Sequence, residues 1–195
     1  MAPKFIILFN GPPRTGKDTV SEFLLKELQG SVIIKFTKPV KDMTHKKYNL
    51  DVEHDYYEDL KDTHLIEFQG KTPRESYIET STNLREKEGN NAVAKLFVKE
   101  VLESTADIVI NPDIGYDFEA EELFNSFDIS NILLFKINRE GKSFEHDCRD
   151  WLTVDTKYEN LKTYNVFNDN KEEFISEVAD YVRDFLVQNS NALIY

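Results

Sequence analysis

Residues 4–29, KFIILFNGPPRTGKDTVSEFLLKELQ, carry the clearest structural signals of this chain. The stretch opens with a near-continuous apolar run, which is typical of a β-strand covered on both faces of a parallel sheet. A glycine-rich turn follows. Apolar residues then recur at helical spacing, and we expect Gly30 to end that helix. The apolar face of the helix comprises Val20, Phe23, Leu24 and Leu28.

The turn matches the pattern G-x-x-x-x-G-K through Gly11, Gly16 and Lys17. Glycines at these positions let backbone N–H groups surround an anion, and the following helix adds the positive end of its dipole. A lysine beside these amides neutralises the β- and γ-phosphates of a nucleoside triphosphate. The turn therefore predicts a phosphate-binding loop. A glycine-rich turn without a ligand is the weaker alternative, because the pattern lies between a strand and a helix signal.

Asp18 stands where such loops usually carry a Ser or Thr that binds Mg²⁺. Since Mg²⁺ prefers hard oxygen ligands and keeps several waters, we expect Asp18 to bind it directly or through water. Arg14 lies inside the loop and either contacts the phosphates or is exposed. We assign Thr15 and Thr19 to the same nucleotide site, although Thr19 could equally be a helix-surface hydroxyl.

The chain has 195 residues and a net charge of −12, with 36 acidic and 24 basic side chains. Such a field repels nucleic acid and anionic membranes, so an anionic substrate needs a local basic cluster. The length fits a single domain over 1–195. The one cysteine, Cys148, forms no intramolecular disulfide and favours a reducing compartment. Because no apolar run is long enough for a leader or a membrane span, we expect a cytosolic protein.

Apolar runs and helical patterns alternate along the chain, which predicts an α/β domain with a central, mainly parallel, five-stranded sheet. Further helical patterns lie at 92–102 and 171–188. Ligands of such sheets bind beyond the carboxyl ends of the strands. The five predicted strands are 4–10, 31–36, 107–113, 131–138 and 163–169. The residues that lie at or just beyond a strand end are Gly11, Asp113, Arg139 and Asn168.

Two long polar segments interrupt this alternation. Residues 41–91, helical in parts, are predicted to be an acceptor-binding insertion, and residues 139–162 a lid-like segment. The acidic stretch 51–62 is more typical of a solvated face than of a metal site.

The loop GPPRTGKDT, residues 11–19, resembles that of the phage-type deoxynucleoside monophosphate kinases, P-loop kinases in which G-K-D-[ST] is usual. The likeness spans most of the chain. It implies a three-layer α/β/α fold, ATP and Mg²⁺ as cofactors, and transfer of the γ-phosphoryl to a (deoxy)nucleoside monophosphate. It also implies a phage protein of the host cytoplasm. The other segments that resemble this family, in order, are FTKPVKDM (36–43), TPRE (72–75), STNLREKEGNN (81–91), NPDIGYDFEAEEL (111–123), KINRE (136–140) and VFNDNKEEF (166–174).

Roles at the strand ends follow from this resemblance. Asp113 would hold Mg²⁺ through water or orient the acceptor, with a capping aspartate as the alternative. Arg139 belongs to a small basic group with Lys142 and Arg149, and we expect Arg139 to stabilise charge on the transferred phosphoryl. The predicted catalytic residues are therefore Lys17, Asp113 and Arg139. Asn168 would approach the adenine of the donor, or form a turn.

Four further residues are predicted to face the acceptor. Arg74 and Arg85 suit phosphate because guanidinium matches its oxygens bidentately, although either could form a surface ion pair. Lys38 and Asp42 follow the second strand, on the acceptor side if the resemblance holds.

Two positions depart from the family pattern: Gly115 stands where an Arg is frequent, and Ser81 where a Gly is usual. A lost arginine removes one phosphate contact and favours a hydroxyl acceptor, such as 5-hydroxymethyluracil in phage DNA. The net charge of −12 disfavours a DNA substrate. A nucleotide-binding regulatory protein without turnover is the third alternative. The base preference and the oligomeric state, a homodimer included, stay open.

Overall fold

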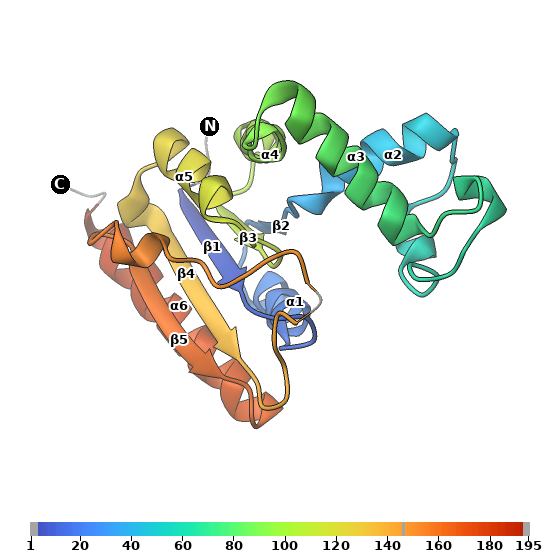
Figure 1. Cartoon of the computed structure of the whole chain (residues 1–195). Coiled ribbons are helices and arrows are strands. Elements are labelled where there is room, and N and C mark those ends of the chain that lie inside the picture. Colours follow the sequence, from blue (N-terminus) through green and yellow to red (C-terminus); the bar gives the residue numbers. More distant parts are fainter. Residues whose placement is uncertain (1–3, 146, 193–195) are drawn as a thin grey trace.

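The structure is a computed structural model that describes residues 4–145 and 147–192. Within these residues five strands form one sheet, parallel throughout, in the order β2-β3-β1-β4-β5 (Figure 1). The predicted strands are confirmed. The second is shorter than predicted because Phe36 already precedes the first turn of a helix. The strand bounds are β1 Phe5–Asn10, β2 Ser31–Ile33, β3 Ile108–Asn111, β4 Ile132–Asn138 and β5 Lys162–Phe167.

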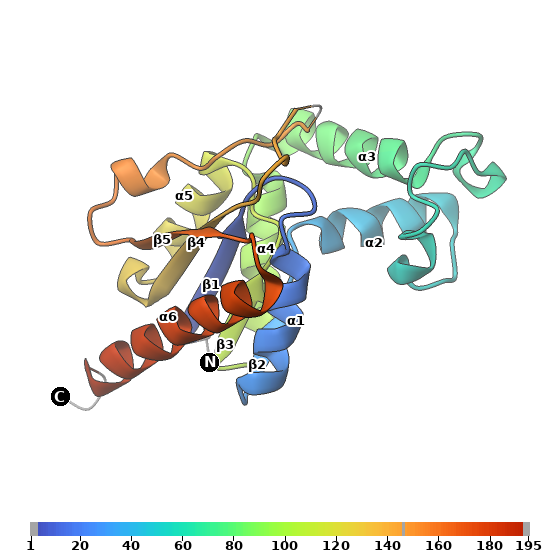
Figure 2. The ribbon, with the colours of Figure 1, turned by 90° about the horizontal axis from the view of Figure 1, so that it is seen from below.

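Helices cover both faces of the sheet, so the predicted three-layer architecture is confirmed. Helices α1 and α6 pack on one face, and α4 and α5 on the other (Figure 2). The first helix ends before the predicted stop at Gly30, because the backbone is already extended at Leu28. The helix bounds are α1 Lys17–Glu27, α2 Thr37–Tyr48, α3 Pro73–Glu88, α4 Ala92–Glu103, α5 Asp117–Ser126 and α6 Lys171–Ala192.

The central strand β1 explains the apolar run that opens the sequence. Successive side chains of a strand point to opposite faces of the sheet. Ile6 and Leu8 therefore pack towards α4 and α5, whereas Phe5, Ile7 and Phe9 pack towards α1 and α6. None of these five side chains is more than 5% exposed. The carboxyl end of this rigid strand carries the glycine-rich turn.

The polar segment predicted over 41–91 forms a helical hairpin, α2 and α3, that projects from the edge of the sheet (Figures 1 and 2). It has an aromatic core of its own. The ring of His45 lies 5.4 Å from that of Tyr57 and 6.0 Å from that of Tyr77, and Phe68 lies 5.0 Å from Tyr57. The hairpin thus has its own cluster of rings, while Val40 of α2 and Leu84 of α3 pack into the core that covers the sheet.

The polar connection over 139–162 runs from the end of β4 past the glycine-rich turn and back to β5 (Figure 1). The buried side chain of Asn10, the last residue of β1, fastens it. Its Nδ2 donates to the carbonyl oxygen of Asp150 at 3.1 Å, and its Oδ1 accepts from the backbone N of Leu152 at 3.1 Å. Across the described ranges, no helix is both long and apolar enough to span a bilayer.

Candidate phosphate-binding site

The turn between β1 and α1 requires both of its glycines. A Cβ on Gly11 would lie 2.5 Å from the carbonyl oxygen of Ile137 in β4. Gly16 has a φ of 103°, in the left-handed region, and its Cβ would lie 2.4 Å from Nδ2 of Asn168. Only glycine permits such close approaches. The turn is therefore pressed against the ends of β4 and β5.

Lys17 is buried at the first position of α1. Its Nζ donates to the carbonyl oxygens of Gly11 and Pro12, both at 2.6 Å, and lies 3.4 Å from Oγ1 of Thr15. Burial lowers the pKa of Lys17 to about 8, and the positive charge of Arg149 acts in the same direction. No carboxylate of the described chain forms an ion pair with this ammonium. A bound anion would supply the negative charge that it lacks.

A cavity of about 280 Å³ opens beside Lys17. Arg139 reaches across to the loop, where its Nη1 donates to the carbonyl oxygen of Arg14 at 3.2 Å. Thr15 is buried instead, and its Oγ1 donates to Pro12, so it shapes the loop. The structure thus brings together six of the predicted site residues. The residues that line the cavity are Arg14, Gly16, Lys17, Asp18, Thr19 and Arg139.

Asn168 lies under the loop, buried at the end of β5. Its Nδ2 donates to the carbonyl oxygen of Thr15 at 2.7 Å, and its backbone N donates to Asn138 at 2.8 Å. The side chain therefore joins the last strand to the phosphate loop. Its contact with adenine stays a prediction.

Asp113 caps the start of α2, which is the alternative that the sequence left open. Its Oδ1 accepts from the backbone N of Phe36 at 2.8 Å and from Nδ2 of Asn111 at 2.9 Å. Its Oδ2 accepts from the backbone N of Thr37 at 3.1 Å and from the Thr37 hydroxyl at 2.8 Å. Both oxygens are committed to the protein. Metal binding by Asp113 stays a prediction.

Asp18 is the exposed carboxylate at the cavity, and it pairs with Lys35 at 2.7 Å. Within the described ranges no three His, Cys, Asp or Glu side chains converge as a metal site. Mg²⁺ commonly binds proteins through one or two carboxylates and takes its other ligands from phosphates and water. Asp18 fits that mode, provided that Lys35 releases it.

The residues predicted to face the acceptor form ion pairs and do not line the cavity. Lys38 lies 3.2 Å from Asp42 and 3.1 Å from Glu100, and Arg74 lies 2.6 Å from Asp62. These groups are about half exposed, so each pair contributes at most about 1 kcal/mol and is easily exchanged for a ligand. Their role as acceptor ligands stays a prediction.

Arg85 belongs to the last part of α3 and faces the start of α5. Its guanidinium carbon is 5.0 Å from the ring centre of Tyr116 and 5.7 Å from that of Phe118. Its Nη2 lies 3.4 Å from Oε1 of Glu119, whose Oε2 accepts from the backbone N of Gly115 at 3.2 Å. Arg85 thus supports the chain that follows β3, and its acceptor contact stays a prediction.

Glu119 is 3% exposed, and burial raises its pKa from 4.5 to about 7 in spite of Arg85. The folded state therefore prefers the protonated form, and its stability falls as the pH rises from about 4.5 to about 7. A shift of this size corresponds to about 3 kcal/mol.

Glu119→Gln keeps an acceptor for the backbone N of Gly115 but cannot ionise. We expect the free energy of unfolding of this variant, relative to that of the wild type, to be higher at pH 8 than at pH 5. Urea unfolding at both pH values measures this, and an equal difference at both would contradict it.

From the sequence alone, no role is assigned to three polar residues that support this region. Asn10 and Lys35 lie in runs that were read only as strands, although a polar residue closing an apolar run was a usable signal. Asp147, which pairs with Arg149 at 2.7 Å, lies in a connection without any periodic pattern. Nothing in the local sequence pointed to it.

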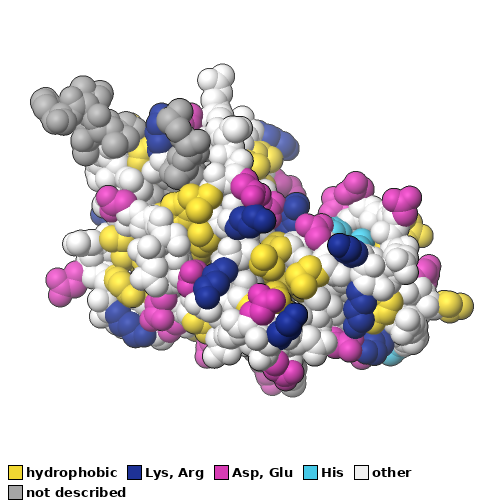
Figure 3. All heavy atoms as spheres, turned by 90° about the horizontal axis from the view of Figure 1, so that it is seen from above, with side chains coloured by type: hydrophobic (Ala, Val, Ile, Leu, Met, Phe, Trp, Pro, Cys, Tyr) yellow, Lys and Arg dark blue, Asp and Glu magenta, His cyan; other side chains and the backbone are white. Residues whose placement is uncertain are grey.

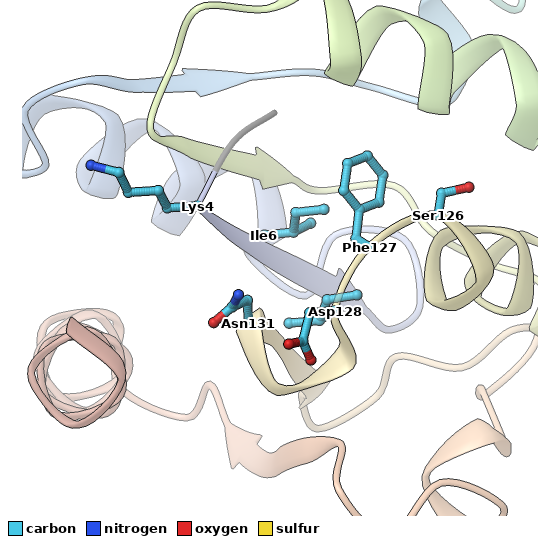
Figure 4. Close-up of a pocket in the computed structure, with 7 residues that line it drawn as sticks. Lys4, Ile6, Ser126, Phe127, Asp128 and Asn131 are labelled. Atoms are coloured by element: carbon cyan, nitrogen blue, oxygen red, sulfur yellow. The ribbon is translucent and has the colours of Figure 1, made fainter. Parts of the chain in front are cut away.

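A second cavity, of about 190 Å³, lies at the opposite end of the sheet (Figure 4). It is lined at the start of β1 by Lys4 and Ile6, and beyond α5 by Phe127 and Asp128, among others. Ligands of open parallel sheets bind at the carboxyl ends of the strands. The cavity beside Lys17 is therefore the candidate site.

No protein-family model matches this chain, and no curated protein sequence matches it. Solved structures do share its fold. A provisionally assigned kinase from Chloroflexus aurantiacus aligns over 96% of this chain and 98% of its own, with 14% identity and a TM-score of 0.53. TT1252 from Thermus thermophilus aligns over 95% and 99%, with 16% identity and a TM-score of 0.53. A thymidylate kinase from Ehrlichia chaffeensis aligns over 92% and 99%, with 13% identity and a TM-score of 0.47.

The first two alignments cover both chains almost completely, so the three-layer α/β fold is shared over its whole length. At such low identity they establish the fold alone. The activity has to be argued from the site.

Proposed function

We propose that the protein is an ATP-dependent phosphotransferase whose acceptor is a (deoxy)nucleoside monophosphate. The observation that carries the proposal is Lys17, a buried ammonium at the N-terminus of α1 that lines the 280 Å³ cavity. Among the residues that the structure describes, its Nζ donates only to its own loop. A helix N-terminus and a lysine together favour a phosphate group. The fold shared with a provisionally assigned kinase supports the same conclusion.

Within this proposal the residues of the chain hold and shield charge. Lys17 contributes its ammonium, and the backbone contributes the N–H groups of Gly11 and of residues 14–16, since residues 12 and 13 are prolines. Arg14 and Arg139 approach from the rim of the cavity. Asp18 is the carboxylate that would hold Mg²⁺. When bound, ATP and Mg²⁺ supply the phosphoryl group and much of the charge that shields it. Transfer of this kind needs alignment and positive charge, with little covalent chemistry from the protein.

The monophosphate acceptor rests on the family resemblance, whereas a hydroxyl acceptor in DNA has the surface charge against it. The net charge is −12. On the face seen in Figure 3, basic side chains are scattered among acidic ones and form no continuous track. A DNA substrate requires such a track to neutralise its phosphates.

A coupled assay of ADP release tests the proposal. The purified chain would be given ATP, Mg²⁺ and, in turn, monophosphates, nucleosides, and DNA containing 5-hydroxymethyluracil. We expect ADP release with at least one monophosphate. Turnover only with the modified DNA would replace the proposal with a hydroxyl kinase, and ATP binding without any turnover would replace it with a regulatory protein.

A further inference from the structure

The side chain of Arg149 lies directly over Gly115, the residue that follows β3 by four positions. A Cβ on Gly115 would lie 2.4, 2.5 and 2.9 Å from Cδ, Cγ and Cβ of Arg149. The φ of Gly115 is not positive, so its backbone does not require glycine. Its lack of a side chain instead leaves the space that Arg149 fills.

Arg149 is firmly positioned there. Its Nε and Nη2 donate to the two carboxylate oxygens of Asp147 at 2.9 and 2.7 Å, and its backbone N donates to the same carboxylate at 2.9 Å. Asn10 at the end of β1 holds the next residue, Asp150. Asp117 of α5 holds Thr153 through its backbone N at 2.7 Å. The connection is thus fastened to both β1 and α5, on either side of Gly115.

Part of the Arg149 guanidinium is left available to hydrogen-bond a ligand. Asp147 occupies Nε and one N–H of Nη2, and Nη1 of Arg149 has no hydrogen-bond partner among the residues that the structure describes. The positive charge of Arg149 acts to lower the pKa of both Lys17 and Arg74. Arg149 therefore repels both Lys17 and Arg74, while Asp147 attracts all three. A bound anion would relieve that repulsion.

We propose that Arg149 binds the phosphate of the acceptor, in the place of a side chain that Gly115 lacks. This inference rests on the proposed function and narrows it to an acceptor that carries a phosphate. Arg14 and Arg139 line the cavity beside Lys17, whereas Arg149 lies over Gly115, past the end of β3. Its charge acts on both Lys17 and Arg74. The glycine at 115 is then no argument for a hydroxyl acceptor, because another segment supplies the cation.

Substitution of Arg149 tests the proposal against a purely structural ion pair with Asp147. We expect Arg149→Ala to raise the KM for the monophosphate about 30-fold, since a charge-assisted hydrogen bond has that effect. The KM for ATP should change less than threefold, and Arg149→Lys should recover part of the loss. The matched control is Arg183→Ala, which removes an arginine paired with Asp180 on α6. An unchanged monophosphate KM in Arg149→Ala would overturn the proposal.

Gly115→Ala tests the placement without removing the charge, because its Cβ displaces the stem of Arg149. We expect it to raise the monophosphate KM in the wild-type background and to have a much smaller effect with Arg149→Ala, in which only the Cβ contact at 2.9 Å remains. The two substitutions then share one interaction. Additive effects would show that Gly115 does not position this arginine. They would overturn the claim that Arg149 fills the place of a side chain at position 115.

Equilibrium binding separates this inference from the proposed function. Calorimetry would compare the four common deoxynucleoside monophosphates with their nucleosides, on wild type and Arg149→Ala. If no acceptor supports ADP release but the wild type binds a monophosphate that Arg149→Ala does not, the proposed function fails and the phosphate site stands. If the wild type binds monophosphates no better than nucleosides, the phosphate site fails whatever the turnover.

Discussion

Lys17→Ala is expected to lower kcat/KM for phosphotransfer on the order of 10³-fold, the size of effect seen when one preorganised charge donor is removed from a buried site. The ammonium of Lys17 is the buried cation at the cavity, and its pKa of about 8 leaves it mostly protonated at neutral pH. Because its hydrogen bonds are to its own loop, the sheet and the two cores should persist without it.

Steady-state ADP release measures this effect, and circular dichroism checks the fold. The matched control is Lys99→Ala, an exposed lysine paired with Glu103 on α4. Addition of ATP and Mg²⁺ should raise the Tm of the wild type and of the control but leave that of Lys17→Ala unchanged. Turnover of Lys17→Ala at the wild-type rate would refute the role assigned to this residue.

Gly11→Ala is expected to destabilise the protein by about 3 kcal/mol, the upper part of the range for overpacking a rigid site. Its Cβ would meet a backbone oxygen of β4 at 2.5 Å, and β4 is an inner strand, paired with both β1 and β5. For a chain of this length the loss corresponds to a fall in Tm of about 6–12 °C.

Gly70→Ala separates this overlap from backbone strain. Gly70 also has a positive φ, 84°, but apart from its chain neighbours no atom of the described residues lies within 4 Å of its Cβ position. We expect only the cost of the left-handed conformation there, about 1 kcal/mol. Thermal denaturation of both variants gives the comparison, and equal losses would show that the contact with β4 is not what requires glycine at position 11.

The sheet and its nucleotide-type loop were predictable because their signals are local. The apolar run before Asn10 identifies a strand buried on both faces, and the spacing of Gly11, Gly16 and Lys17 identifies the loop. Each signal lies within a few residues, so no knowledge of tertiary contacts was needed.

The polar partners were not predictable, because they depend on how distant segments meet. Asp113 caps a helix that begins 76 positions earlier in the chain, at Thr37. Arg149 was recognised as basic, but its place over Gly115 is set by a connection without periodicity. The stacking of Arg85 on Tyr116 has no local signal in the sequence either, and the contact of Arg85 with an acceptor phosphate stays a prediction. Side-chain chemistry alone does not reveal such pairings.

The aromatic cluster of the α2–α3 hairpin has a consequence for engineering. Its rings pack around His45, whereas Val40 of α2 and Leu84 of α3 belong to the same core as Ile6 and Leu8 of β1. A hairpin grafted from another chain therefore leaves the central strand undisturbed only when it brings apolar side chains to these two positions.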